Sequence, residues 1–306
     1  MAGYLAQRVI QSAFILLGIA AFTFLLLYLV PADPAVQLAG RSATAQTVAN
    51  IRRELGLDQP LATQFLRYLG NLLHGDLGRS YAQKTDVATL IGARLPASLT
   101  LMAAGIAAEL AIGLTLGVLA AVHRNSLLDR GLMIASFTTI SAPQFLVALF
   151  LLYLFAATLG WFPMSGFGGA AHVVLPAMTL GILGAGWYAR IVRSTMIDVL
   201  DQDYIRTARA KGVAESSVVL RHALPNALLP VVAMIGIDIG QFMSGLVVVE
   251  AVFGWPGIGQ LAWQAIQQVD IPIIMGVTLV SAFAIVLGNL IADLIAPFVD
   301  PRIRLR

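Results

Sequence analysis

Long uncharged runs alternate with polar stretches along this chain. The first run, residues 9–30, has 22 residues, which is enough to cross a hydrocarbon core of about 30 Å at about 1.5 Å per helical residue. The pattern therefore predicts an all-α integral membrane protein with six transmembrane helices. The five further runs are residues 97–122, 132 to about 159, about 172–189, 227–249 and 272–297.

The run at residues 9–30 has a rival interpretation as a secretory signal peptide. It is longer than the apolar core of an ordinary signal, and it ends in Pro31-Ala-Asp-Pro34 instead of a clear cleavage site of small residues. We therefore expect residues 1–30 to form the first transmembrane helix.

The polar stretches divide the rest of the chain. Residues 31–96 are expected to form an extracytoplasmic excursion, with short surface helices at 47–55 and 60–73 that are broken by Gly56 and Gly75. Residues 97–298 would then form a core of five transmembrane helices. This core includes a cytoplasmic loop at 200–226 and an outer loop at 250–271, and residues 299–306 form a cytoplasmic tail.

Composition supports a membrane protein. The chain is 58% hydrophobic and 11% charged, and its mean hydropathy is +0.84, which is too apolar for a soluble globule. It contains no cysteine, so thiol chemistry and cysteine metal sites are excluded. Basic and aromatic residues do not interleave into a surface that would bind nucleic acid.

The distribution of basic residues predicts the orientation. The loop at 190–226 carries six Arg or Lys residues, whereas the short loops at 160–171 and 250–271 carry none. The positive-inside rule then places this basic loop and both chain termini in the cytoplasm. The basic residues of the 31–96 excursion carry little weight, because the rule holds for loops of up to about 60 residues.

The segment 203–225 in this basic loop is expected to dock another protein. Asp201 or Asp203 can cap a helix start, and Gly212 can supply the left-handed turn that ends the helix. A second short helix would run from Glu215 until Pro225 stops it. The alternative is an ordinary solvated basic loop that only sets the orientation.

Several motifs resemble the dipeptide/oligopeptide/nickel permease family of bacterial ABC importers. Gly212 is followed after nine residues by His222-Ala-Leu-Pro225, which is the spacing of the loop by which such permeases engage their ATPase. Arg206-Thr-Ala208 replaces the general Glu-Ala-Ala of this loop and looks like the peptide-family variant. The other similar motifs are Pro31-Ala-Asp-Pro34, Leu55-Gly-Leu-Asp-Gln-Pro60, Gly75-Asp-Leu-Gly-Arg-Ser80, Tyr204-Ile-Arg-Thr-Ala-Arg-Ala-Lys-Gly212, His222-Ala-Leu-Pro-Asn-Ala-Leu-Leu-Pro230 and Phe253-Gly-Trp-Pro-Gly-Ile-Gly259.

The resemblance implies a type I ABC importer permease in the bacterial cell membrane. It would pair with a second homologous permease, two cytoplasmic ATPase subunits that bind ATP and Mg, and an extracytoplasmic substrate-binding protein. The substrate would be a di- or oligopeptide, with nickel or glutathione as alternatives. The residues that would couple to the ATPase are Asp203, Tyr204, Arg206, Thr207, Ala208, Arg209, Ala210, Lys211, Gly212, His222, Leu224 and Pro225.

Acidic residues inside the predicted spans are candidates for the translocation path, because a charge at mid-membrane is costly. Asp238 and Gln241 share a face of the fifth span, away from the stripe of Gly236, Gly240 and Ser244. Asn289 and Asp293 form a further polar pair of the path. Glu109 shares its face with Gly105, Gly113 and Gly117, which favours burial in a helix contact. For each acid the alternative is a satisfied polar group that holds helices together.

The outer loop offers a candidate gate or docking surface. Its residues Phe253, Trp255, Pro256, Gly257 and Gly259 resemble the family's segment near the pore mouth. The alternative is an aromatic anchor at the headgroup level, which would suit Trp255 and Trp263.

The sequence lacks the residues that several other functions would need. Gly78-Arg-Ser-Tyr-Ala-Gln-Lys-Thr85 has glutamine where a phosphate-binding loop needs its second glycine, so no ATPase or other catalytic site is expected. The histidines lack metal-ligand spacing. An intramembrane serine protease would need a nucleophile motif that Ser165 and Ser244 do not have. A proton-coupled secondary transporter using Glu109, Asp238 and Asp293 remains an alternative. The four histidines are His74, His123, His172 and His222.

Overall fold

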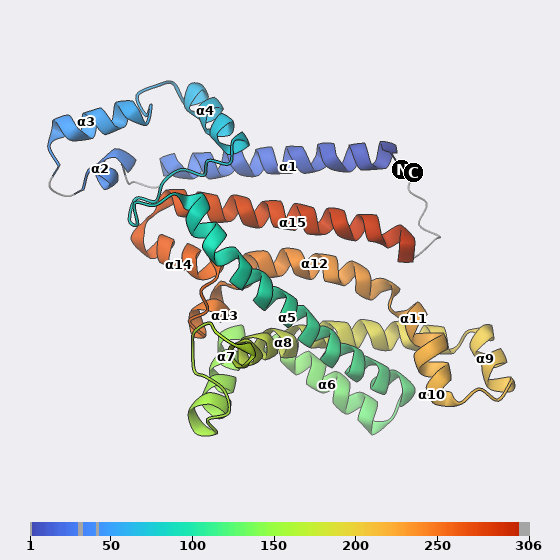
Figure 1. The fold of residues 1–306 in the computed structure, drawn as a ribbon. Helices are drawn as coiled ribbons and strands as arrows, with labels where there is room; N and C mark the ends of the chain where they lie inside the picture. Colours follow the sequence, from blue (N-terminus) through green and yellow to red (C-terminus); the bar gives the residue numbers. More distant parts are fainter. Residues whose placement is uncertain (1, 30–32, 41–42, 300–306) are drawn as a thin grey trace.

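The computed structural model describes residues 2–29, 33–40 and 43–299. Helices make up its regular structure, and the described residues contain no strand, only an isolated antiparallel bridge between Arg79 and Asp86. Figure 1 shows an elongated bundle in which α1 and α15 run side by side. The predicted cytoplasmic tail at 299–306 lies almost wholly outside the described residues, as does part of the Pro31-Ala-Asp-Pro34 motif.

Four helices are long and apolar enough to cross a membrane, and there are up to six spans if two bent helix pairs each count as one. The expectation of six transmembrane segments agrees with the upper number. The four single helices are α1 (Ala2–Leu29), α5 (Val87–Val122), α8 (Ala170–Leu200) and α15 (Ile271–Val299). The bent pairs contain α6 (Leu127–Ser141), α7 (Gln144–Leu151) with η1 (Leu152–Thr158), and α10 (Glu215–Ser217) to α12 (Leu229–Gly245).

The predicted span at 132–159 is not one continuous helix. The α6 and α7 axes differ by 105°, and the break falls at Ala142 and Pro143. Proline favours an extended conformation in the residue before it, and Ala142 has a ψ of 133°. The chain therefore turns sharply at Pro143, and the predicted span consists of two helices instead of one.

The predicted second span also begins earlier than expected. Residue 97 was the expected start, but α5 begins at Val87 behind the N-cap Asp86 and continues through Pro96. The excursion before it contains α2 (Pro34–Ala39), α3 (Ala45–Glu54) and α4 (Leu61–Leu73). The last two agree with the predicted surface helices at 47–55 and 60–73.

Small residues bring the central helices together. A methyl group on Gly113 or Gly117 of α5 would lie 2.9 Å and 2.8 Å from the carbonyl oxygens of Ala185 and Ala189 in α8, respectively. Such close backbone approach is typical of helix packing in membranes. On the other side of the bundle, Gly240 of α12 packs against Ile285 of α15, as the predicted glycine stripe implied.

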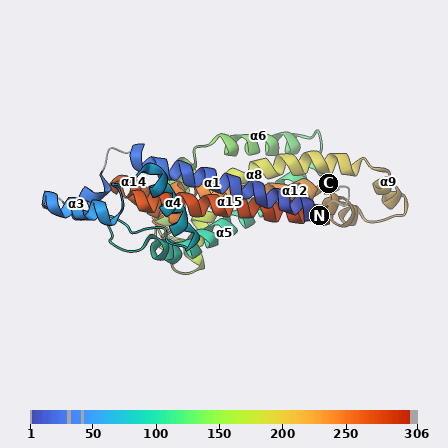
Figure 2. The same cartoon turned by 90° about the horizontal axis from the view of Figure 1, so that it is seen from above.

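The two ends of the bundle carry different structures. The start of α1, the end of α15 and the unit α9 (Asp203–Ala210) to α11 (Leu224–Ala227) lie at one end (Figure 1). Helices α2 to α4 and α14 (Ile258–Gln268) lie at the other end, and the view from above gives the same division (Figure 2). This arrangement is the one expected if both termini and the basic loop share one side of the membrane.

Candidate functional site

The basic loop folds into a compact unit at one end of the bundle. Its first helix, α9, ends where Gly212 adopts a φ of 77°. The Gly212 amide donates to the Arg209 carbonyl at 2.9 Å, and the Val213 amide donates to the Ala208 carbonyl at 3.3 Å. These two bonds form a Schellman motif, so the predicted left-handed turn at Gly212 is confirmed.

A buried face fixes this unit to the long helix α8. Ile205 and Ala208 of α9 are buried together with Val218 and Ala223 of η2 (Val218–Ala223). They pack in one cluster with Met196 near the end of α8. Apolar burial therefore holds the unit against the end of α8.

The capping prediction for α9 was wrong. The N-cap is Gln202, and no side chain caps the helix start. Asp203 already lies in the first turn, where its carboxylate pairs with the Arg206 guanidinium instead. At the other end of α9, Arg209 makes two bonds to the Glu215 carboxylate, at 2.7 and 3.0 Å.

The prediction that Pro225 ends the second helix was also wrong. The chain passes from α10 through the π-helical turn η2 into α11, and the break comes at Leu228. Pro225 lies in the first turn of α11, where a missing N–H group leaves no helical bond unmade. The helical segment therefore runs past Pro225 to Ala227, and the chain bends by 52° at Leu228 before α12.

Most of the predicted coupling residues are at the surface. Among them Tyr204 stands out, because its apolar ring is 46% exposed, and Leu220 of the same unit, which was not predicted, is 57% exposed. Ala208 is buried and Leu224 is half-buried, so these two belong to the internal packing. The exposed predicted residues are Asp203, Tyr204, Arg206, Thr207, Arg209, Ala210, Lys211, Gly212, His222 and Pro225.

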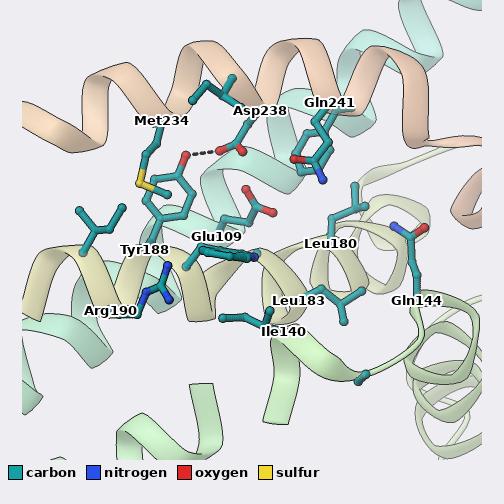
Figure 3. A pocket seen from close by; sticks show the side chains of 16 residues that line it. Glu109, Ile140, Gln144, Leu180, Leu183, Tyr188, Arg190, Met234, Asp238 and Gln241 are labelled. Atoms are coloured by element: carbon teal, nitrogen blue, oxygen red, sulfur yellow. Dashed lines mark hydrogen bonds between the residues drawn. The ribbon is translucent and has the colours of Figure 1, made fainter. Parts of the chain in front are cut away.

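A cavity of about 560 Å³ lies among α5, the α6–α7 bend, α8 and α12. Asp238 and Gln241 of α12 both line it, as their shared face predicted. Glu109 of α5 lines it too, and the Tyr188 hydroxyl of α8 donates a hydrogen bond to Asp238 (Figure 3). The sequence placed Glu109 in a helix contact separate from Asp238, whereas the structure brings the two acids together.

Glu109 is buried in a helix contact, as its glycine-rich face predicted, and it also lines the cavity. Its side chain is only 3% exposed, and it sits directly against Gly184 of α8, where an added Cβ would overlap its carboxyl group. Its Oε2 atom nevertheless has no hydrogen-bond partner among the described residues. The glycine contact therefore holds the carboxyl group at the cavity and leaves this oxygen without a partner among the described residues.

The other two predicted path residues do not join this cavity. Asn289 lines a separate, smaller pocket of about 90 Å³ with Arg8, Gln11 and Ser12 of α1. The Asp293 side chain lies outside the part of the chain that the structure describes. Asn289 therefore does not share the cavity of Asp238 and Gln241, because α15 presents it to α1.

The predicted outer gate is an internal part of the fold. Phe253 and Trp255 are 2% and 0% exposed, and the Trp255 indole N–H donates to the Ala97 carbonyl at 2.9 Å. Trp255 also meets Phe167 edge-on at 4.9 Å. These two aromatic residues are therefore neither a docking surface nor headgroup anchors, whereas Trp263 is 46% exposed.

Glu250 holds this outer segment, although the sequence analysis did not single it out. The residue lies in α13 (Val247–Val252) with an exposure of 0%. Its carboxylate accepts from the Ser98 hydroxyl at 2.6 Å and from the Gln260 amide at 2.8 Å, at the start of α14. An added Cβ on Gly257 would overlap the same carboxylate. Burial raises the pKa of Glu250, and these hydrogen bonds oppose the shift.

Asp270 makes a second buried anchor that was missed. Its carboxylate accepts from the Ser80 hydroxyl at 2.5 Å and from the amides of Tyr81 and Ala82 at 3.2 and 3.0 Å. Burial and the nearby Asp270 charge raise the pKa of the Tyr81 phenol. The sequence does carry one signal for such anchors, which is an acid inside an apolar stretch, such as Glu250 between Val247 and Phe253. An acid in this position is expected to be buried, and a buried charge needs partners.

Comparison with known families decides what kind of protein carries these features. Residues 113–305 match the family described as binding-protein-dependent transport system inner membrane component, and residues 1–102 match its N-terminal membrane-component family. The chain belongs to this family. As an importer permease of the peptide and nickel group, it is a multi-pass protein of the bacterial inner membrane.

Relatives of this permease match along the whole chain. A protein of Brucella abortus (strain 2308), named as a permease of a peptide transport system, is 41% identical over 99% of both chains. The glutathione transport system permease protein GsiC of Salmonella paratyphi A is 40% identical, also over 99% of both. The MetNI methionine ABC transporter, solved in inward-facing conformations, shares the permease fold with a TM-score of 0.59. It is 20% identical, and the match covers 69% of this chain and 96% of that one.

Proposed function

We propose that this permease imports peptides as half of a translocation path whose energy comes from separate ATPase subunits. Two relatives have peptides in their names: one is named for a peptide transport system and the other for glutathione, which is a tripeptide. A second permease, two ATPases that bind ATP and Mg, and an extracytoplasmic binding protein would complete the importer.

The observation that carries the coupling proposal is the two-faced construction of the α9–α11 unit. Its inner face is buried against α8, and its exposed residues include Tyr204 and Leu220 as well as several charged side chains. Exposed apolar side chains rimmed by charges are typical of protein interaction sites. Rigid-body movement of a docked ATPase would then displace the ends of α8 and α12 that are attached to the unit.

The cavity at Glu109, Asp238 and Gln241 is the candidate for this chain's share of the path. It lies between the helices that the coupling unit would move, since α8 leads into α9 and α12 follows α11. A change in the distance between α8 and α12 would open or close it. The predicted gate at Phe253 to Gly259 would act in this proposal as a rigid outer wall.

The docking proposal is tested by placing a charge on the exposed apolar side chains. Tyr204→Glu and Leu220→Glu should each reduce co-purification of the ATPase subunits and abolish coupled peptide uptake, while the permease pair still assembles. Gln46→Glu, an exposed change on α3 at the opposite end, is the matched control. ATPase binding that survives both changes would show that the unit is not the docking surface.

A further inference from the structure

The cavity described above contains charges of both signs at different depths. Glu109 and Asp238 approach it from α5 and α12, and Arg190 of α8 lines it as well (Figure 3). The Arg190 guanidinium stacks over the Trp187 ring at 4.5 Å from its centroid. It forms no ion pair with any residue that the structure describes, so its charge is available to a ligand.

The acidic side of the cavity is short of donors, although Glu109 and Asp238 share a hydrogen bond with each other. Glu109 is almost completely buried, yet its Oε2 atom is without a hydrogen-bond partner among the described residues. The Tyr188 hydroxyl is already committed to Asp238, and it has only one proton to donate. A buried carboxyl oxygen without a donor is unfavourable, and an ammonium group, with three donors and a positive charge, would satisfy both acids at once.

The spacing of the two charged sides suits a short peptide. Gly184, which touches Glu109, lies six residues before Arg190 on α8, which is about 9 Å along a helix axis. An extended chain spans about 3.3 to 3.6 Å per residue. Two or three residues therefore cover the distance between an ammonium group at the acids and a carboxylate at Arg190.

The cavity walls fit the rest of such a ligand. Gln144 supplies an amide group that can bond to a peptide backbone, and Leu180, Leu183 and Met234 supply apolar surface. A binding cavity with mainly apolar walls and a few placed polar groups is the usual form of a small-ligand site. This lining gives no preference for particular side chains of the bound peptide.

We infer that this cavity binds a zwitterionic di- or tripeptide during transport, with its α-ammonium group at Glu109 and Asp238 and its carboxylate toward Arg190. Arg190 lies on the side of the acids that faces α9, so the carboxyl end leads toward the cytoplasm. The inference rests on the proposed peptide transport and adds the recognition of both peptide ends within the membrane.

The test uses the complete importer in nanodiscs without its binding protein, so that selection by that protein does not interfere. The probe is an alanyl dipeptide with a photoreactive diazirine side chain, in free, N-acetylated and C-amidated forms. In the wild type, the free form should label segments 180–191 and 234–242. Glu109→Gln combined with Asp238→Asn should reduce this labelling at least tenfold, and Arg190→Gln should reduce it severalfold.

The modified probes decide which end each residue recognises. Labelling by the N-acetylated form should be weak and unchanged by the acid substitutions, and labelling by the amidated form should be unchanged by Arg190→Gln. Asp198→Asn, an exposed change on the same helix, is the control and should label like the wild type. Free-probe labelling that is absent from the wild type or unaffected by these substitutions would overturn the inference.

Uptake measured on the full importer with its binding protein keeps the two proposals apart. If wild-type proteoliposomes accumulate the free dipeptide but the substitutions change neither labelling nor uptake, the cavity assignment fails and peptide transport stands. If the wild type accumulates no peptide at all, the proposed function fails as well.

Discussion

Buried acids occur in two regions of this permease, and their surroundings differ. At the outer end, Glu250 and Asp270 are both 0% exposed, and each accepts hydrogen bonds from a serine hydroxyl and from backbone amides. In the central cavity, Glu109 is equally buried, but one of its carboxyl oxygens lacks a donor in the described structure. The comparison teaches that buried acids with all their hydrogen bonds made hold the fold together. A buried acid with an oxygen that lacks a hydrogen bond marks a candidate site for a ligand.

The largest effect is expected at Glu250. Glu250→Ala leaves the Ser98 hydroxyl and the Gln260 amide without their acceptor in a buried setting and opens a void beside Gly257. We expect a loss of about 3 kcal/mol or more in the free energy of unfolding, measured by thermal unfolding of the purified complex. Glu54→Ala, at an exposed position on α3, should leave the unfolding midpoint unchanged, and equal midpoints for both variants would contradict the structural role.

A smaller effect is expected at Asp270. Asp270→Asn keeps the shape of the side chain but replaces one acceptor oxygen by a donor, which then faces either the Ser80 hydroxyl or a backbone amide. The cost should be about 1 to 3 kcal/mol, and hydrogen exchange at residues 80–86 should speed up relative to α14. The exposed Asp58→Asn provides the comparison. Protection that remains intact in the Asp270 variant would mean that this carboxylate does not hold the segment.

The smallest effect on stability is expected at Glu109. Glu109→Gln has nearly the same shape and removes repulsion between two neighbouring carboxyl groups, so the free energy of unfolding should change by less than about 1 kcal/mol or rise. Comparison of the thermal unfolding midpoints of Glu109→Gln and Glu250→Gln checks this directly. A larger loss at Glu109 than at Glu250 would reverse the comparison, and Glu109 would then be a structural residue.

Local features were predictable where they depend on neighbouring residues. The Gly212 turn followed from the need for a positive φ at a helix end, and the apolar runs predicted spans near their observed positions. The shared face of Asp238 and Gln241 followed from helical spacing. In contrast, the sharp bend at Pro143 and the continuation of helix past Pro225 depend on how each proline is placed relative to a helix start, which the local pattern does not fix.

Long-range features could not be predicted in the same way. Glu109 and Asp238 lie on helices that are distant in sequence, and they meet only because glycines of α5 and α8 allow close packing there. Asp270 and Ser80 are 190 residues apart, so neither residue indicates the other. The burial of Trp255 likewise depends on the Ala97 carbonyl at the distant start of the second span.

ATP-driven uptake of a labelled alanyl dipeptide tests the central proposal most directly. Proteoliposomes would contain this chain with its partner permease, ATPases and binding protein, or the same assembly without the ATPases, or one with Gly212→Pro. A proline fixes φ near −65°, whereas Gly212 requires 77°. We predict uptake only in the complete wild-type importer with ATP. Uptake that persists without the ATPases and collapses with the proton gradient would contradict the account and favour a proton-coupled transporter.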